Sequence, residues 1–478
     1  MIAELKSYPA MKDSGVPSLG YVPEHWGVRR LRTVADMRVS NIDKHSNDNE
    51  QTVRLCNYVD VYKHDRISTH MPFMRATASM PEIARFRLAV GDVLITKDSE
   101  SWNDIGVPAH VVESAEDLVC GYHLALLRSV PELLTGAYLF RAVQSEGVAH
   151  QLHIKANGVT RFGLSHSAIK STWVPTPPLN DQAAIVRFLD YADGRIRQYI
   201  HAKQQLIKLL EEQKQVIIHR AVTRGLNPDV PFKPSGVECL GDVPEHWEVL
   251  RGKYVFDPVD VRSVTGSEEL LTVSSRHGIV PRASREVSMF MAASYVGHKL
   301  CWPEDLVINS LWAWAGGFGF SRHHGIVSTA YGVYRPRKQF SGLWQYLDLA
   351  LRSGAYDWQF HVRSKGIWKS RLQLTDPAFL DMPVVLPPEG EATAICERVG
   401  AETAEIEEAV AKAEREISLL GEYRTRLIAD VVTGKLDVRE AAAGLPDELE
   451  LIDEADLEEV IGDELADDLD TELEEVEA

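Results

Sequence analysis

The 478-residue chain is poor in cysteine and has no long apolar run. Its five cysteines are scattered, and no two of them form a Cys-x-x-Cys pair. This pattern argues against a disulfide framework and a structural zinc site, and it indicates a reducing environment. No stretch approaches the ~18 apolar residues of a membrane span, and the N-terminus lacks the apolar segment of a signal peptide. We therefore expect a cytoplasmic protein that does not contact a membrane.

Catalytic motifs are missing as well. The sequence has no Gly-x-x-x-x-Gly-Lys-Ser/Thr phosphate loop, no Asn-Pro-Pro-Tyr/Phe methylase motif and no nuclease motif. His323 and His324 are adjacent, but the further ligands that zinc requires do not accompany them. A Ser/His/Asp or paired-carboxylate site that no motif marks stays open. The sequence predicts a chain without catalytic residues, metal or bound cofactor of its own.

A surplus of basic residues, the usual mark of a nucleic-acid binder, is absent too, since the net charge is −19. The acidity belongs to one end of the chain, where residues 440–478 carry 18 acidic side chains and no Lys or Arg. The rest of the chain holds 51 basic and 52 acidic side chains. We predict that 439–478 is a disordered acidic tail, because like charges at this density repel one another. Such a tail can serve solubility or can imitate DNA in a binding cleft.

What the sequence does contain is an internal duplication. Residues 15–30 and 236–251 are identical at eleven of sixteen positions, including an unbroken Val-Pro-Glu-His-Trp at 22–26 and 243–247. The Glu-His-Trp triplet could suggest a catalytic or metal site. However, a proline turn followed by Trp and Val fits a strand that packs into a core. We interpret the motif as the structural start of each copy, and the chain as two tandem copies of one module.

The copies also agree at their ends, where residues 181–226 and 391–436 align without gaps. Apolar residues recur there at alternating steps of three and four over roughly five heptads, although Lys203 and Glu416 are among the residues that interrupt the seam. Prolines precede each segment and a glycine lies beside its last turn, as expected for a helix start and stop. We predict two long helices that pair antiparallel about a pseudo-two-fold axis. A helix of about 43 residues spans about 65 Å, enough to hold two readers one to two DNA turns apart.

Between these shared ends the two copies agree only sporadically. Asp92-Val93-Leu94-Ile95 and Asp305-Leu306-Val307-Ile308 are matching candidates for buried strands. Short β-type runs, turns and a few helical stretches predict α/β (α+β) domains. The predicted divisions are a first variable domain at 1–175, a first spacer helix at 176–228, a second variable domain at 229–384, a second spacer helix at 385–438 and the tail at 439–478.

Two glycine-centred basic loops, 155–161 and 363–371, occupy equivalent places in the variable domains. Their basic side chains suit phosphates, and their amide, hydroxyl and arginine groups suit base edges, although ordinary exposed turns would look similar. In the aromatic segment 312–324 we expect Trp312 and Phe318 to pack into the domain. The candidate DNA-contacting residues are Lys155, Asn157, Gly158, Thr160, Arg161, Arg322, His323, Lys365, Gly366, Trp368, Lys369 and Arg371.

These features together resemble the specificity subunits of type I restriction–modification systems, over nearly the whole body of the chain. The resemblance is carried by the duplicated Gly-Val-x-x-Leu-Gly-x-Val-Pro-Glu-His-Trp, by the proline-led helices, and by Asp305-Leu306-Val307-Ile308-Asn309, Trp312-Ala313-Trp314, Gly325-Ile326-Val327-Ser328 and Ala330-Tyr331. It implies two target-recognition domains on an antiparallel pair of conserved helices. Each domain would read one half of a split, asymmetric site in double-stranded DNA. The acidic tail is not part of the resemblance.

The resemblance also implies partners. Two methylase subunits would bind S-adenosylmethionine and methylate adenine. Motor-nuclease subunits would use ATP and Mg to translocate and cut unmodified DNA. Two other interpretations stay open: a coiled-coil scaffold or regulator that reads no sequence, and a self-contained methylase or nuclease, which the missing motifs disfavour.

Overall fold

A computed structural model describes residues 5–45, 47–237, 240–275, 277–284, 294–366 and 372–446. Most of the predicted acidic tail therefore lies outside the described residues. The chain divides into two compact units. Unit 1 takes in the residues up to Ile200 and those from Ile417, and unit 2 is formed by His201–Glu416. Each unit thus combines one variable domain with one part of each long helix.

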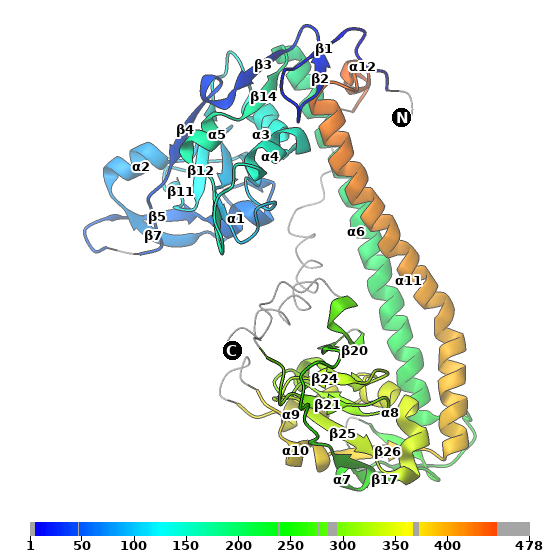
Figure 1. The fold of residues 1–478 in the computed structure, drawn as a ribbon. Coiled ribbons are helices and arrows are strands. Elements are labelled where there is room, and N and C mark those ends of the chain that lie inside the picture. Colours follow the sequence, from blue (N-terminus) through cyan, green and yellow to red (C-terminus); the bar gives the residue numbers. More distant parts are fainter. Residues whose placement is uncertain are drawn as a thin grey trace. The chain divides into compact units, whose positions relative to one another are not determined.

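The domain of unit 1 is built from short strands and five short helices (Figure 1). The strands are β1 Met11–Asp13, β2 Tyr21–Pro23, β3 Gly27–Arg30, β4 Ala35–Val39, β5 Gln51–Cys56, β6 Arg66–Ile67, β7 Met74–Ala78, β8 Val93–Thr96, β9 Asp98–Ser99, β10 Pro108–Val111, β11 Leu118–Cys120, β12 Leu124–Ser129, β13 Phe162–Gly163 and β14 Trp173–Thr176. The helices are α1 Tyr58–Lys63, α2 Met80–Phe86, α3 Gly136–Gln144, α4 Glu146–His153 and α5 His166–Lys170. The short helix α12, Arg439–Ala443, packs into the same core through Val438, Ala442 and Leu445. The first residues of the predicted tail, 439–478, are therefore part of the fold, because their apolar side chains are buried against unit 1.

The domain of unit 2 has a related element order. Its strands are β15 Phe232–Pro234, β16 Asp242–Pro244, β17 Glu248–Arg251, β18 Phe256–Pro258, β19 Leu271–Ser274, β20 Gly278–Pro281, β21 Lys299–Cys301, β22 Leu306–Ile308, β23 Phe318–Phe320, β24 Gly325–Val327, β25 Gly332–Pro336 and β26 Pro383–Leu386. Its helices are α7 Gly252–Val255, α8 Trp344–Leu351, α9 Asp357–Arg363 and α10 Asp376–Leu380.

The two domains share one antiparallel four-stranded arrangement. The order is β4-β12-β8-β10 in unit 1, where β6 adds a parallel edge strand, and β18-β25-β22-β23 in unit 2. The central strands β8 and β22 are the two segments predicted to be buried, and every residue in both is buried. The α/β (α+β) fold class and this pair of matching strands are therefore confirmed.

A buried aspartate precedes each of these central strands and fixes the same turn. Asp92 accepts the backbone N–H of Ala89 at 2.7 Å and a bidentate pair of bonds from Arg128 on β12, both 2.7 Å. In unit 2 Asp305 accepts two bonds from Arg335 on β25, at 2.7 and 2.8 Å. A buried carboxylate needs such partners, because an unpaired charge away from water costs several kcal/mol. The same buried carboxylate–arginine pair in both domains explains why an aspartate precedes the central strand in each copy.

The rest of each domain differs. Unit 1 adds a three-stranded sheet, β11-β5-β7, where unit 2 has two separate ribbons, β19-β20 and β21-β24. The two domains thus share the four-stranded sheet but differ in the strands added to it. This difference accounts for the poor sequence agreement between the copies.

The two predicted spacer helices are present and nearly equal in length. α6 runs over Leu179–Arg224, 46 residues, and α11 over Glu389–Val432, 44 residues. They lie alongside each other (Figure 1). Among the described residues, no helix has the length and apolar character needed to cross a membrane.

Charged residues pair across the two helices, among them Lys203 and Glu416, which interrupt the predicted apolar seam. In unit 2, Lys203 Nζ lies 2.7 Å from Glu416 Oε2, and Lys214 Nζ lies 2.9 Å from Glu407 Oε1. Residue numbers rise along one helix as they fall along the other, so the helices are antiparallel, as predicted. The seam itself is less continuous than predicted, since Leu206 is 41% exposed. Long charged side chains bridge the helices where apolar contact is lost.

The duplicated opening motif joins each domain to both helices. In unit 1, Trp26 Nε1 donates to Asp181 Oδ2 at 3.0 Å, and His25 Nε2 lies 2.9 Å from the same oxygen. Asp181 is in the first turn of α6, where a carboxylate also stabilises the helix N-terminus. Gly434, just past α11, has a φ of +72°, and a Cβ there would lie 2.3 Å from Pro23. The motif therefore fits against the start of one helix and the end of the other.

The opening motif of unit 2 makes the same contacts, but with the start of α11 and the end of α6. Trp247 Nε1 donates to Glu391 Oε2 at 3.1 Å in the first turn of α11, and His246 Nε2 lies 2.7 Å from that oxygen. Gly225, at the end of α6, has a φ of +69°, and a Cβ there would lie 2.8 Å from Glu391. The interpretation of the motif as a structural start, rather than a catalytic or metal site, agrees with these contacts.

A buried charge network fixes the domain of unit 1 to its helices. Arg141 on α3 lies 2.7 Å from Asp190 and 3.3 Å from Asp193 on α6. Arg424 on α11 also binds Asp193, and it lies 2.8 Å from Asp65, which immediately precedes β6. Arg66 and Arg197 complete the network through Asp190, Asp193 and Asp65. Sequence patterns gave no sign of it, because its members come from separate segments.

Candidate nucleic-acid interface

The first candidate loop is a short, closed excursion from the domain of unit 1. The backbones of Asn157 and Gly163 exchange two hydrogen bonds, at 3.1 and 2.9 Å, and so close the loop at its base. β13, at the end of the loop, pairs with β9. The tip from Gly158 to Arg161 is exposed, and Val159 is 94% exposed. A Cβ at Gly158 would lie 1.9 Å from the carbonyl oxygen of Arg161, so only glycine fits this tight tip.

The predicted residues of this loop divide into two groups. Thr160 and Arg161 lie at the exposed tip, where they are open to a ligand. Lys155 instead lies half-buried behind the loop, and its Nζ donates to Ser171 Oγ at 3.1 Å. Burial, and to a lesser extent the charge of Arg30, lowers the pKa of Lys155. Asn157 uses its side-chain amide on the carbonyl of Lys155 at 2.9 Å, and so supports the loop from within.

The second candidate loop has the same base. Lys365 and Gln373 exchange two backbone hydrogen bonds of 3.0 Å each, at the place that Asn157 and Gly163 occupy in unit 1. Lys365 and Gly366 are exposed. The remaining candidates of this loop, Trp368, Lys369 and Arg371, lie outside the described residues.

Both loops are followed by a leucine that anchors them in the same way. Leu164 is buried and its N–H donates to the carbonyl of Lys97, which follows β8, at 2.8 Å. Leu374 is buried and its N–H donates to the carbonyl of Ser310, which follows β22, also at 2.8 Å. The structure thus places the two loops on equivalent sites of equivalent sheets.

Arg322 and His323 lie between β23 and β24. Arg322 is exposed and borders a pocket formed with α8 and α11, whose lining includes Asp348, Cys396 and Glu397. His323 is half-buried, with its backbone N–H donated to Ser321 Oγ at 3.1 Å. Phe318 is buried against Phe360, with ring centroids 4.2 Å apart, and so packs as expected. Trp312 is half-buried and stacks on Trp314.

Sequence reasoning missed a polar and aromatic cluster beside the first loop. Lys97 Nζ lies 4.9 Å from the centroid of the Tyr122 ring and 2.9 Å from Asp98, which also contacts His123 at 2.9 Å. Burial would raise the pKa of Asp98, but His123 and Lys97 hold it below its ordinary value. Trp102 is 50% exposed on the same excursion of the chain. These residues come from segments 97–104 and 120–123, which only the fold brings together.

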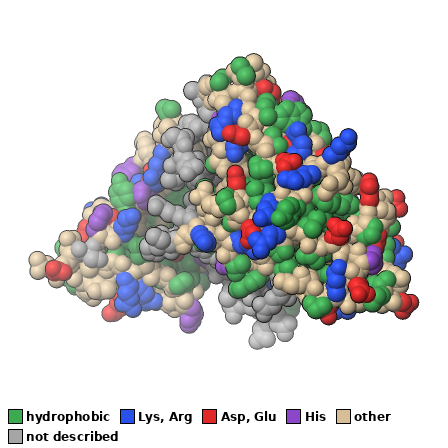
Figure 2. All heavy atoms as spheres, turned by 90° about the horizontal axis from the view of Figure 1, so that it is seen from below, with side chains coloured by type: hydrophobic (Ala, Val, Ile, Leu, Met, Phe, Trp, Pro, Cys, Tyr) green, Lys and Arg blue, Asp and Glu red, His purple; other side chains and the backbone are tan. Residues whose placement is uncertain are grey.

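Charge is mixed on the face of the molecule that Figure 2 shows. Figure 2 shows Lys and Arg side chains intermingled with Asp and Glu on the face turned to the viewer. The variable domains are close to neutral by count, with 17 basic and 16 acidic residues over 27–174 and 16 and 12 over 248–382. A ligand that binds here is therefore held by local groups more than by an overall field.

Fold and site together define a class: a protein with two copies of a domain that displays a variable loop from a common sheet, held by two antiparallel helices. No protein-family model matches the chain. Among curated proteins, one named "Putative type I restriction enzyme MjaX specificity subunit", from Methanocaldococcus jannaschii, is 24% identical over 235 residues, which cover 48% of this chain and 53% of that protein. The type I restriction enzyme MjaVIII specificity subunit of the same organism is 25% identical over 126 residues, 26% of this chain and 28% of that protein.

Among solved structures, a chain described under the complex assembly and conformational transition of the type I R-M system shares the fold. Its TM-score is 0.58 at 15% identity, over 87% of this chain and 99% of that one. The chain spans about half the length of the first curated relative, whose match covers 53% of it. The resemblance to specificity subunits of type I restriction–modification systems is confirmed by these comparisons.

Proposed function

We propose that this chain is the DNA sequence-specificity subunit of a type I restriction–modification complex. Each variable domain reads one half of a bipartite, asymmetric site in double-stranded DNA. The chain itself performs no catalysis and directs its partners to methylate adenine or to cleave unmodified DNA. S-adenosylmethionine, ATP and Mg belong to those partners in this proposal.

One observation carries the proposal: two equivalent sheets display equivalently anchored loops with different residues. The first loop offers Thr160 and Arg161, and the second offers Lys365 at its base. A symmetric dimer would present one surface twice and read a palindrome. A fused pair with different loops reads two different half-sites, and the frame that holds the loops is the part that stays the same.

In this proposal the loops work by two kinds of contact. Arg161 and Lys365 pair with phosphates and set the register of the protein on the duplex. The hydroxyl of Thr160, at the tip of the first loop, addresses a base edge in the major groove. A firmly positioned duplex is what a methylase subunit needs in order to flip its target adenine out of the stack.

The long helices supply a surface for the methylase partners. In unit 2, Leu206, Leu209 and Val216 of α6 are 41%, 61% and 68% exposed. Steps of three and seven residues place them on one face of the helix. An exposed apolar row of this kind is characteristic of a protein interface. We assign it to a methylase subunit, and the motor-nuclease subunits complete the complex.

Loss of the gene tests the proposal most directly. In a methylome of the host, we expect one bipartite adenine motif to disappear when this gene is deleted and to return when the chain is supplied again. A methylome that keeps every motif after deletion would contradict the proposal. A scaffold or regulator without sequence readout would change the extent of methylation at all motifs, and not the presence of one.

A single exposed cation tests the phosphate contact. Arg161→Ala is expected to weaken DNA binding uniformly over sequences and to reduce the slope of log K against log salt by about 0.9, the contribution of one phosphate contact. Arg426→Ala is the matched control, because Arg426 is 84% exposed on α11 in the same unit. The affinity of the complex is measured from low to moderate salt on the mapped duplex, which is a DNA duplex that carries the motif found in the methylome. If wild type and Arg161→Ala show the same slope of log K against log salt, Arg161 does not contact a DNA phosphate.

A further inference from the structure

An open aromatic pocket lies immediately before the second loop. It is lined by Ser275, Trp314, Ala315, Gly316, Asp357, Trp358 and His361, and it has a volume of about 530 Å³. Trp358 and His361 belong to α9, which ends at Arg363, two residues before the base of the loop. The pocket therefore lies partly on the helix that leads into the base of the second loop.

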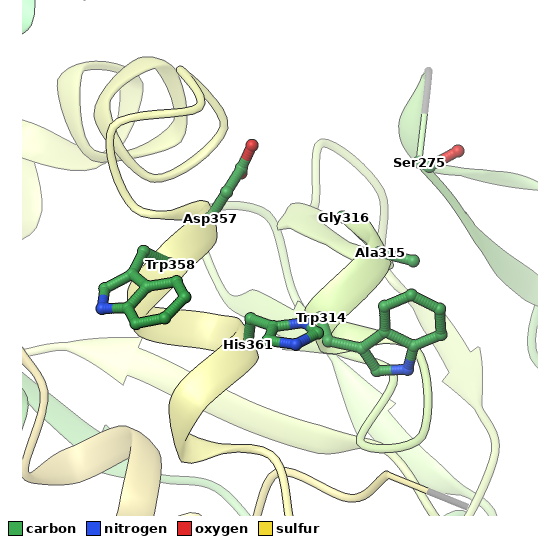
Figure 3. Close-up of a pocket in the computed structure, with 7 residues that line it drawn as sticks. All are labelled: Ser275, Trp314, Ala315, Gly316, Asp357, Trp358 and His361. Carbon is green, nitrogen blue, oxygen red and sulfur yellow. The ribbon is translucent and has the colours of Figure 1, made fainter. Parts of the chain in front are cut away.

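The rings of the pocket form a continuous aromatic wall. Figure 3 shows the His361 ring between the indoles of Trp314 and Trp358. The His361 centroid is 6.4 Å from Trp358, with planes 20° apart, and 6.3 Å from Trp314, with planes 78° apart. Trp312 backs Trp314 in a stack with a centroid separation of 5.5 Å. Trp358 is 57% exposed, so one large π-face is open to a ligand.

A glycine turn directly after Trp314 shapes the backbone of the pocket. Gly316 adopts a φ of +82°, and a Cβ at Gly317 would lie 2.8 Å from the Trp312 side chain. The two glycines thus let the chain turn tightly behind the indoles. Asp357 and Ser275 supply a carboxylate and a hydroxyl at the rim, where Figure 3 shows them on either side of the opening. Partial burial raises the pKa of Asp357.

Equivalent positions of the first domain keep part of this set. His153 stands at the end of α4 as His361 stands near the end of α9, at the same offset of 208 that relates the two loops. Trp102 follows β8 and β9 as Trp314 follows β22, and it is 50% exposed. The histidine is thus common to the two positions, and each domain also has a partly exposed tryptophan after its central strand.

We infer that the pocket of Trp314, Trp358 and His361 stacks an unpaired nucleobase of the bound DNA, next to the second recognition loop. The inference rests on the proposed function. The ligand is a planar aromatic ring with polar edges. An indole face accepts any base, and Asp357 and Ser275 can hydrogen-bond to its edge. A base becomes available when the duplex is opened for methylation, since flipping leaves the opposite base unpaired.

The experiment uses the complex of the full chain with its methylase partner, bound to the duplex mapped by the methylome. 2-Aminopurine replaces one base of the second half-site at a time. At one position we expect fluorescence that is quenched in the wild-type complex, rises in Trp358→Ala and falls again in Trp358→Phe, which restores a π-face. Trp358→Ala should also weaken duplex binding by about ten- to a hundredfold, without a change in salt slope, because stacking releases no counterions.

Tyr254→Ala is the matched control, because Tyr254 is 53% exposed in the same unit and does not line the pocket. If the wild-type complex binds the mapped duplex but no labelled position responds to Trp358→Ala, the inference fails and the proposed function stands. If the complex does not prefer the mapped duplex to other DNA, the proposed function fails, and the inference with it. Free 2-aminopurine deoxyriboside is added to the complex on unlabelled duplex as a further test. If its fluorescence is quenched equally, and recovers equally in Trp358→Ala, the assignment of the pocket to a base of bound DNA is wrong.

Discussion

Replacing Asp193 by alanine is expected to destabilise unit 1 by about 3–5 kcal/mol, the cost of breaking a buried ion pair by removing one partner. Only 9% of the Asp193 side chain is exposed, and it lies within ion-pair distance of Arg141, Arg197 and Arg424. Without it, three cations remain close together with less compensating charge. Urea unfolding of the full chain, with hydrogen exchange to locate the change, measures the effect. Hydrogen exchange should show the loss in α3 and in the parts of α6 and α11 that belong to unit 1.

Arg426→Ala is a suitable control for this substitution. It removes an i,i+4 pair with Asp430 on the surface of α11, only two residues from Arg424. Exposed pairs of this kind contribute roughly 0.3–0.5 kcal/mol, so the control should unfold almost as wild type does. A loss of under 1 kcal/mol in Asp193→Ala would show that the network contributes little to unit 1.

The same network predicts a dependence on pH. Burial alone would raise the pKa of Asp193, but Arg141, Arg424 and Arg197 outweigh burial and hold it well below its ordinary value of 3.8. A carboxyl with a depressed folded-state pKa stabilises the fold above its ordinary pKa and loses this contribution as the pH falls toward the folded-state value. The difference in unfolding free energy between wild type and Asp193→Asn should therefore be full at pH 7 and should shrink below pH 3.8.

Shortening both long helices together is expected to change the DNA site itself. Removal of residues 204–210 from α6 and 409–415 from α11 keeps the Lys203–Glu416 and Lys214–Glu407 pairs. Seven residues of helix correspond to about 10 Å, or about three base-pair steps. If the helices set the distance between the two half-sites, the unread gap should shorten by about three base pairs and methylation of the original site should be lost. A methylome of the variant strain measures both.

Removing one heptad from α6 alone is the matched control. It breaks the register between Lys214 and Glu407, so the pair of helices should no longer assemble and no bipartite motif should be methylated. A double deletion that methylates the original site with its original gap would reject the role of the helices as spacers.

Much of the frame could be predicted because it leaves repeated local signals. Two copies of one opening motif, a proline-led start and a terminal glycine mark helices whose observed bounds, Leu179–Arg224 and Glu389–Val432, lie close to those expected. Matching apolar runs marked β8 and β22. Each of these signals lies in consecutive residues, so chain order alone reveals it.

The candidate interface was less accessible to such reasoning. The loops could be found, because a glycine among basic residues recurs at one offset. Lys155, however, supports its loop from behind, and Arg322 borders a pocket with α8 and α11. Burial and direction of a single side chain depend on neighbours far away in sequence. The cluster of Lys97, Tyr122 and His123 left no sequence signal for the same reason.

The sequence by itself determined that this protein is a duplicated module with two long antiparallel helices and two divergent domains, because repeats and periodicity are properties of chain order. Only the tertiary structure decided which residues close the loops and which buried charges hold unit 1 together. It also decided that Trp314, Trp358 and His361 share one pocket. Those choices depend on which strands pair and which side chains lose their water, and residues distant in sequence settle them jointly.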